Sequence, residues 1–182
     1  MIANQIAGLM GVGAPVSLTD YESIATASGG STSVTFASIP SIYSHLQLRI
    51  FYSITTSGVN EDLQVRFNSD SGTNYTLHQL KGNGSTASAF AATSKTEIAP
   101  AVINTTTSST YSTCVLDILD YSNTNKYKTT RDLFGWDANG SGDVGLRSGL
   151  WLNTAAISNI GITFATGATF SSASSFALYG IK

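Results

Sequence analysis

Charge is scarce in this chain of 182 residues. Asp, Glu, Lys and Arg make up 11% of it, against roughly 25% in an average soluble domain. Only 9 residues are Lys or Arg, and the formal net charge is -2. Proteins that bind nucleic acid neutralise phosphates with clustered basic side chains, so the composition argues against nucleic acid as a partner. Low charge also gives little repulsion between copies, which suits a protein that works within an assembly.

Cysteine is nearly absent, because Cys114 is the single one. No disulfide can form within the chain, which excludes a disulfide-stabilised scaffold. Cys114 lies in an apolar run and is expected to be a small buried side chain. A catalytic thiol would need a neighbouring base, but His45 and His78 fall in other predicted strands. We therefore expect no cysteine nucleophile.

Apolar runs long enough to span a bilayer are also lacking. The first twenty residues are small, apolar and uncharged through Pro15, but they are too short and too interrupted by glycine to cross a membrane. They also lack the basic start of a signal peptide. One interpretation is a disordered tail. The other is an arm, residues 1–20, that binds a neighbouring subunit or a capsid through its apolar residues Ile2, Ile6, Leu9 and Met10.

Apolar residues that are present alternate with a period of two. The longest such run, residues 45–54, places on one face the side chains of Leu46, Leu48, Ile50, Tyr52 and Ile54. Shorter runs at residues 63–67, 160–164 and 176–178 repeat the pattern, and no window sustains helical spacing. Clusters of Gly, Asn, Asp and Ser separate the runs at intervals of about ten residues. The chain is therefore predicted to be all-β: one sandwich or jelly roll of about eight to ten antiparallel strands over residues 21–182.

Motifs for metal-ion or acid–base chemistry are weak. Residues 137–143 match the front half of a calcium loop, but Ser148 stands where the bidentate glutamate would be. A tight Asn-Gly hairpin is the favoured alternative there. Asp117 and Asp120 could form a carboxylate pair for glycoside hydrolysis, yet their spacing on a strand would point them to opposite faces. The sequence therefore predicts no enzyme, no cofactor and no metal.

Aromatic residues are the remaining candidates for a binding site. Exposed rings on a β-sandwich can stack on sugars, and the candidates are Trp136, Trp151 and Tyr127, with Tyr75 as an extension. Trp151 lies between two leucines in a predicted strand, so packing in the core or between subunits is the favoured interpretation for it.

Several longer segments carry a resemblance to a known family. Residues 38–50, 66–75, 117–128, 148–151 and 174–182 are similar to a recurring pattern in virion structural proteins of tailed bacteriophages. These segments are spread over the chain after Tyr21 and do not include the first twenty residues. The resemblance implies a jelly-roll protein of the phage particle, either a capsid decoration (cement) protein or a minor head or tail component. It implies no catalytic residue.

The sequence and the resemblance together predict a non-enzymatic protein of the virion. It would bind the major capsid protein on the outer capsid surface and stabilise contacts between capsomers, as a homo-oligomer and specifically a trimer. The alternative is a receptor- or glycan-binding module of a tail fibre or spike. Exposed Trp136 and Tyr127 on one concave surface would favour the alternative, whereas an ordered apolar arm would favour the capsid protein. An enzyme acting on glycans is a third hypothesis, for which the sequence offers no convincing residue set.

Overall fold

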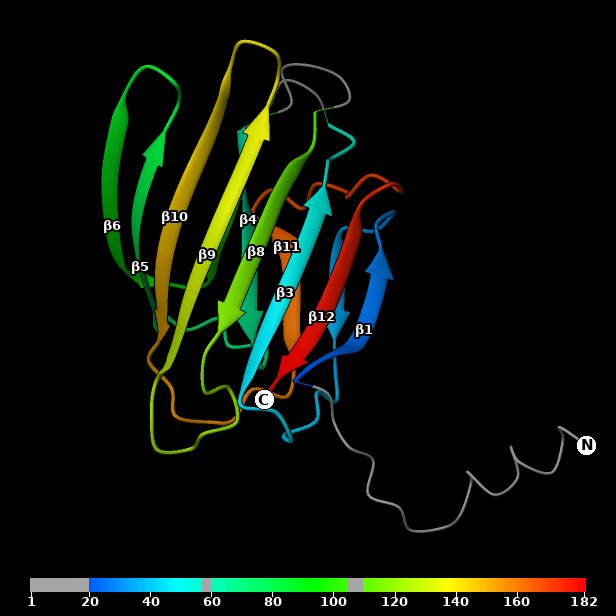
Figure 1. The fold of residues 1–182 in the computed structure, drawn as a ribbon, viewed down its shortest axis with the longest axis vertical. Coiled ribbons are helices and arrows are strands. Elements are labelled where there is room, and N and C mark those ends of the chain that lie inside the picture. The colour runs from blue at the N-terminus through cyan, green and yellow to red at the C-terminus, as the bar shows by residue number, and fades with distance from the viewer. Residues whose placement is uncertain (1–19, 57–59, 105–109) are drawn as a thin grey trace, which may run out of the picture.

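The computed structural model describes residues 20–56, 60–104 and 110–182, which form twelve antiparallel strands and no helix (Figure 1). The all-β prediction is confirmed, and the two sheets are consistent with a β-sandwich. Within those residues there is accordingly no helix that could cross a bilayer. The predicted arm lies outside the described residues except for Asp20, whose carbonyl accepts a hydrogen bond from the Lys182 amide over 3.2 Å.

The two sheets differ in size. The larger sheet has eight strands in the order β1 (Tyr21–Ser28), β12 (Ser175–Ile181), β3 (His45–Tyr52), β8 (Ser112–Ile118), β9 (Lys128–Asp137), β10 (Gly142–Trp151), β5 (Tyr75–Gly82) and β6 (Ala87–Lys95). The smaller sheet has four strands in the order β2 (Ser33–Phe36), β11 (Ile160–Phe164), β4 (Asn60–Phe67) and β7 (Ile98–Asn104).

The predicted number of eight to ten strands was too low, and the reason is local. Strand β2 is only four residues long. Strand β6 has the sequence ASAFAATSK, in which Phe90 is the one large apolar side chain, so no alternation is visible. Strand β7 is buried along nearly its whole length and therefore also lacks a period of two.

The core lies between the four-stranded sheet and the larger sheet, and it extends from the β1-β12-β3-β8 half to Phe134 of β9, Trp151 of β10 and Tyr75 of β5. The alternation predicted for β3 is confirmed, because Leu46, Leu48 and Tyr52 are fully buried. The same holds for β4, β11 and β12, whose alternate apolar side chains fill the space between the sheets. Cys114 is also buried, as predicted. Aromatic rings cluster here, for example Phe170 against Phe176 with centroids 4.9 Å apart.

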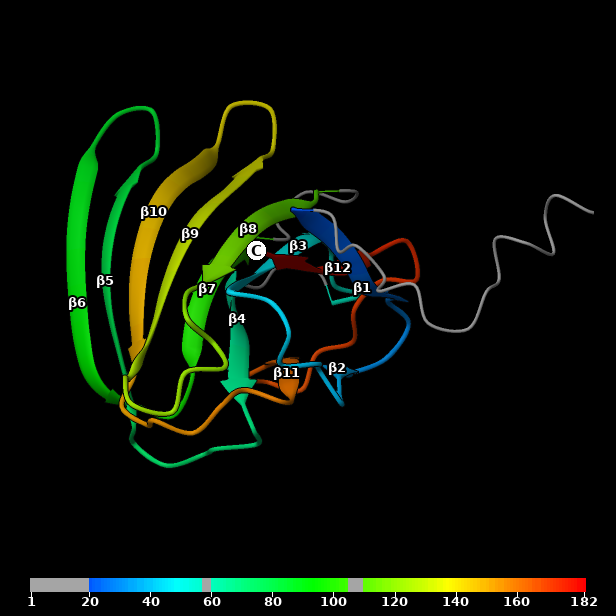
Figure 2. The ribbon, with the colours of Figure 1, turned by 60° about the horizontal axis from the view of Figure 1, so that its bottom comes forward.

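Four strands of the larger sheet, β9, β10, β5 and β6, form what we call the wing. Strand β7 packs against β9 and β10, but Figure 2 shows β10, β5 and β6 extending past the four-stranded sheet. Most of β6 is exposed on both of its faces. One half of the larger sheet is therefore covered by a second layer, while the far end of the other half is not.

A buried lysine fixes the loops at one end of the molecule. Lys128 is fully buried at the start of β9, and its Nζ donates hydrogen bonds to the carbonyls of Asn123 (2.6 Å), Lys126 (2.8 Å) and Thr154 (3.0 Å). Burial lowers the pKa of its ammonium group. The three bonds tie the β8-β9 loop to the β10-β11 loop.

Candidate functional site

The wing carries apolar side chains on the face turned away from the four-stranded sheet, which we call the outer face. Cross-strand pairing sets Val115 of β8 opposite Leu133, Leu133 opposite Leu146, and Leu146 opposite Leu80. Val144 follows in the next row of β10. These residues are the apolar strip, which crosses four neighbouring strands.

The apolar strip is open to solvent. Val115 is 37% exposed, Leu133 53%, Leu146 and Leu80 56% each, and Val144 60%. Single exposed apolar residues are common, but a contiguous row of them usually marks an interaction surface. Because adjacent members sit directly opposite each other on paired strands, they form one continuous surface.

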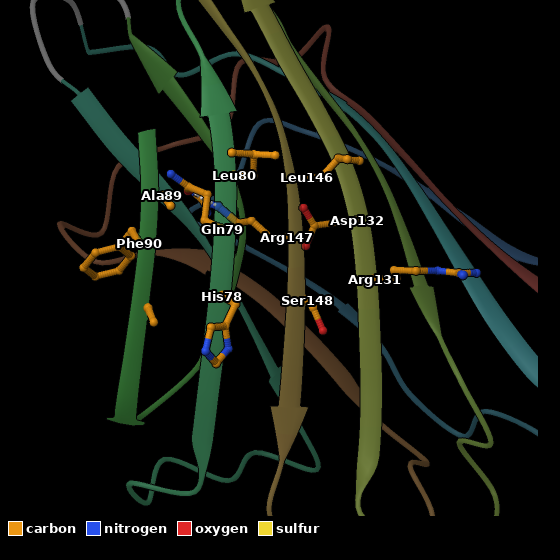
Figure 3. Close-up of a pocket in the computed structure, with 11 residues that line it drawn as sticks. His78, Gln79, Leu80, Ala89, Phe90, Arg131, Asp132, Leu146, Arg147 and Ser148 are labelled. Atoms are coloured by element: carbon orange, nitrogen blue, oxygen red, sulfur yellow. Dashed lines mark hydrogen bonds between the residues drawn. The ribbon is translucent and has the colours of Figure 1, made fainter. Parts of the chain in front are cut away.

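A hollow of about 600 Å³ lies on the wing beside the strip. Figure 3 shows His78 and Leu80 on β5, and Leu146 and Ser148 on β10, among its lining residues. Ala89 and Ala91 of β6 complete its edge. The hollow is therefore lined by apolar side chains together with the charged side chains of Arg131, Asp132 and Arg147.

Polar residues border the strip one row away. Arg131 approaches the Asp117 carboxylate at 3.4 Å, and Gln47 donates a hydrogen bond to the same carboxylate over 2.9 Å. On the far half of the sheet, Arg49 stacks over the rings of Tyr21 and Tyr179. An apolar centre with a polar border is the usual layout of a protein–protein interface.

The inner face of the wing contains buried charged residues among its apolar ones. Arg147 is buried there, with its guanidinium carbon 4.7 Å from the centre of the Phe134 ring. It donates hydrogen bonds to Gln79 and to the Ala99 carbonyl, and it lies 3.5 Å from the Asp62 carboxylate. Arg147 thus links β5 to β7 by hydrogen bonds. The equivalent inward-facing positions in the covered half are occupied by apolar residues.

Asp132 faces Arg147 across the β9-β10 pair and is also buried. Neither of its carboxyl oxygens has a hydrogen-bond partner of normal geometry among the described residues. Burial raises the pKa of Asp132 to about 8, although the charge of Arg147 acts in the opposite direction. The wing thus contains a buried carboxyl group whose surroundings favour its protonated form.

Sequence reasoning missed both the apolar strip and this polar pair. The signal was the placement of charges: Asp132 precedes Leu133, and Arg147 follows Leu146. On each strand the charged residue and the leucine therefore point to opposite faces. Either the charge is buried or the leucine is exposed, and in this structure both are the case.

Trp151 is a core residue, in agreement with the favoured interpretation. It is 1% exposed, and its ring contacts Phe67 and Tyr75 with centroids 5.6 and 6.3 Å away. Its indole nitrogen donates a hydrogen bond to Asp70 over 2.7 Å. Burial alone would raise the pKa of Asp70, but the bonds from Trp151, Asn74 and the Gly72 amide hold it below its ordinary value.

Trp136 and Tyr127 do not form a shared aromatic platform. Tyr127 is 52% exposed in the loop before β9, whereas Trp136 lies near the other end of that strand. Nine residue steps along a strand separate them by roughly 30 Å. Tyr75, the proposed extension, is fully buried. The concave surface that would have favoured glycan binding through these rings together is therefore not formed.

The two carboxylates considered for glycoside hydrolysis are held separately. Asp117 lies on β8 and contacts Arg131, while Asp120 lies in the following turn with a φ of 50°. The hydrogen bond and charge of Lys126, 2.7 Å away, lower the pKa of Asp120. A general acid needs a raised pKa, so this environment does not suit that role.

Residues 137–143 form the tight hairpin between β9 and β10. The Ala138 amide donates to the Ser141 carbonyl over 2.8 Å, and both Asn139 and Gly140 have positive φ. These are the features of a type I′ Asn-Gly turn, as the sequence indicated. The Asp137 carboxylate accepts a hydrogen bond from the Asn139 amide.

The two histidines and Cys114 are likewise apart from one another in the sheet. His45 accepts a hydrogen bond from the Asp120 amide, and His78 lies on the outer face of β5. Burial raises the pKa of the Cys114 thiol well above its ordinary value. Among the described residues, no three His, Cys, Asp or Glu side chains gather as a group able to hold a metal ion.

Comparison with known proteins adds no family to these observations, since neither the protein-family models nor the curated proteins contain a match to this chain.

Proposed function

We propose that this chain is a non-enzymatic structural protein of a bacteriophage particle, which binds the outer surface of the capsid and stabilises contacts between capsomers. The observation that carries the proposal is the apolar strip, an exposed row of large aliphatic side chains on a continuous sheet. The resemblance of several segments to phage virion proteins supports the choice of partner. The low charge of the chain gives little repulsion against a neighbouring surface.

The mechanism is linkage between binding and assembly. A subunit that binds the closed shell but not its separated capsomers stabilises the shell by mass action. Removing Leu80, Leu133, Leu146 and Val144 from water against the capsid would supply the driving force, at about 1–1.5 kcal/mol for each, because about half of each side chain is already buried in the subunit. Arg131 and Asp117 on the border would set orientation more than affinity.

The arm and the oligomer belong to the same proposal. Residues 1–20 carry Ile2, Ile6, Leu9 and Met10, which would add apolar contacts to the capsid or to a neighbouring copy. A trimer would suit a three-fold position on an icosahedral shell. The major capsid protein is the expected partner, and the virion the expected location.

The test uses capsids of the same phage that have been purified without this protein. We expect the intact chain to occupy them and to raise their temperature of disruption. The double variant Leu80→Ser/Leu146→Ser should occupy them at least about tenfold less well, because it removes two large side chains from the strip. Ile42→Ser is the matched control, since Ile42 is 58% exposed but lies outside the strip. Equal occupancy by the double variant and the control would refute the role of the strip.

A second candidate function is receptor or glycan binding, and one observation favours it. A hollow of about 340 Å³ lies where the β5-β6 and β9-β10 hairpin tips meet, and it is lined in part by Trp136, Asn83 and Asp143. An aromatic ring beside amide and carboxylate groups is a suitable sugar subsite. Binding on a glycan array that is lost in Trp136→Ala, together with no binding to capsids, would favour this function over the first.

A further inference from the structure

The free edge of β6 is the least protected edge of the molecule. Strand β6 ends the eight-stranded sheet and pairs only with β5 among the described strands. Its nine residues, Ala87–Lys95, include one charge, at Lys95. The irregularity in its pairing with β5 falls beyond Ala92, so residues 87–92 remain regular. A long, regular, uncharged edge strand is a template for pairing with another chain.

The other three sheet edges carry features that disfavour such pairing. Strand β1 carries Glu22 and has a bulge between Ser23 and Ala25. Strand β2 has only four residues, and β7 contains Pro100, which cannot donate a backbone hydrogen bond. Bulges, short length and proline are the usual means by which sheet edges avoid one another. Only β6 lacks all of these in its first six residues.

We propose that β6 pairs antiparallel with β6 of a second copy of this chain, so that the two eight-stranded sheets continue into one another across a two-fold axis. Such an axis, perpendicular to the sheet, keeps the same face of both copies on the same side. It also sets each residue opposite a residue of the partner strand whose side chain points to the same face of the sheet. The interface is self-complementary, as a two-fold contact requires, and it is separate from the contact between copies through the arm that is proposed for the trimer.

The position of Phe90 supports self-pairing. Phe90 is 57% exposed on the inner face, next to the midpoint of the regular part of β6. Two-fold pairing about this midpoint sets the two Phe90 rings directly opposite or diagonal to each other, within about 5–8 Å between backbone positions. An aromatic cross-strand pair would then cover side chains that are otherwise open to water.

The remaining side chains and the charge also fit. The flanking residues Ala87, Ser88, Ala89, Ala91 and Ala92 are small, so the strands can approach without displacing bulky groups. Lys95 lies at one end of β6, so antiparallel pairing places the two copies of its charge at opposite ends of the interface. The apolar strips of both copies would lie on one face of the combined sheet.

Charge substitution at the edge tests the pairing in the isolated protein, without any capsid. We expect light scattering coupled to gel filtration to give the unmodified protein a mass twice that of the double variant Ala89→Lys/Ala91→Lys. In the paired strands these lysines would face each other across the axis. Both positions are exposed, so circular dichroism and the melting temperature should change little. The matched control is Thr26→Lys/Ser28→Lys on the outer face of β1, which should keep the mass of the unmodified protein.

Cross-linking gives a second measurement that does not depend on the lysine variants. Directly opposite residues in antiparallel strands meet the Cα separation of a disulfide. In the variant Ala89→Cys/Ala91→Cys, at least one cysteine faces a cysteine of the partner whether the axis passes at residue 89, 90 or 91. We expect a covalent dimer on oxidation, and none from Thr26→Cys/Ser28→Cys. A monomeric unmodified protein, or an unchanged mass in Ala89→Lys/Ala91→Lys, would overturn the proposal, as would the absence of the cross-link.

Discussion

The two halves of the larger sheet use the same alternation of residues for opposite purposes. In β3, the residues that face the four-stranded sheet are aliphatic or aromatic, and those on the outer face include Gln47 and Arg49. In β10, the inner face carries Arg147 and the outer face carries Leu146. The difference lies in the second layer, which covers β3 fully, whereas only its edge strand β7 reaches β9, β10 and β5, and β10, β5 and β6 extend past it (Figure 2).

This contrast shows that a period of two identifies a strand but does not say which of its faces is buried. An apolar face needs a partner, either within the chain or outside it. The covered half satisfies that need with the four-stranded sheet. The wing leaves it unmet on the outer face, while its inner face is held by hydrogen bonds around Arg147. The unmet apolar surface is the basis of the proposed attachment.

The largest expected effect is a difference in stability between leucines of the two halves. Leu48→Ala removes a fully buried side chain and should lower the free energy of unfolding by about 3–5 kcal/mol. Leu146→Ala removes one that is 56% exposed and should change it by less than about 1 kcal/mol. Denaturant unfolding measures both. A loss above 2 kcal/mol in Leu146→Ala (a threshold set between those two estimates) would mean that the outer face of the wing is packed within the subunit.

The covered half was also the part of the fold that the sequence predicted best. Alternation in β3, β4, β11 and β12 gave the buried faces correctly because apolar residues fall on one side only. Strand β6 could not be found in this way, since alanine and serine fit either face. The Asn139-Gly140 hairpin was predictable because the turn requires positive φ at both positions.

The candidate site was harder to predict, for a physical reason. Leu80, Leu133 and Leu146 come from three strands that are neighbours because of the order β9-β10-β5. In the sequence, β5 ends at Gly82 and β9 begins only at Lys128, so the three leucines are not close along the chain. Local sequence carries no information on that order. The aromatic residues attracted attention instead because they are chemically distinctive, yet Trp151 and Tyr75 are buried.

The second prediction concerns the polar interior of the wing. The pKa of Asp132 is about 8 in the folded protein and roughly 3.9 in an unfolded chain. Between these values the folded state holds a proton that the unfolded state releases, so raising the pH favours unfolding. We expect the free energy of unfolding to fall by on the order of 3 kcal/mol between pH 5 and pH 8 because of this group.

The variant Asp132→Asn sharpens this test, because an amide of similar size keeps the neutral form at every pH. Its stability should depend much less on pH over the same interval. Denaturant unfolding of both proteins at pH 5, 6, 7 and 8 gives the difference directly. If the two proteins show parallel pH profiles, Asp132 is ionised in the folded wing, and its pairing with Arg147 outweighs its burial.

The smallest effect compares a glycine of the wing with a glycine of the four-stranded sheet that covers the other half. Gly140 in the wing hairpin has a φ of 116°, which an L side chain rarely adopts, although an added Cβ would meet no atom within 4 Å. Gly161 in β11 also has open space around an added Cβ and has no such φ. Gly140→Ala should therefore lower the free energy of unfolding by about 1 kcal/mol through backbone strain. Gly161→Ala should leave it unchanged or raise it by about 0.5 kcal/mol, because the unfolded chain loses freedom. If the melting temperature falls equally in both variants, the loss of stability comes from packing around the added methyl group and not from backbone strain in the turn.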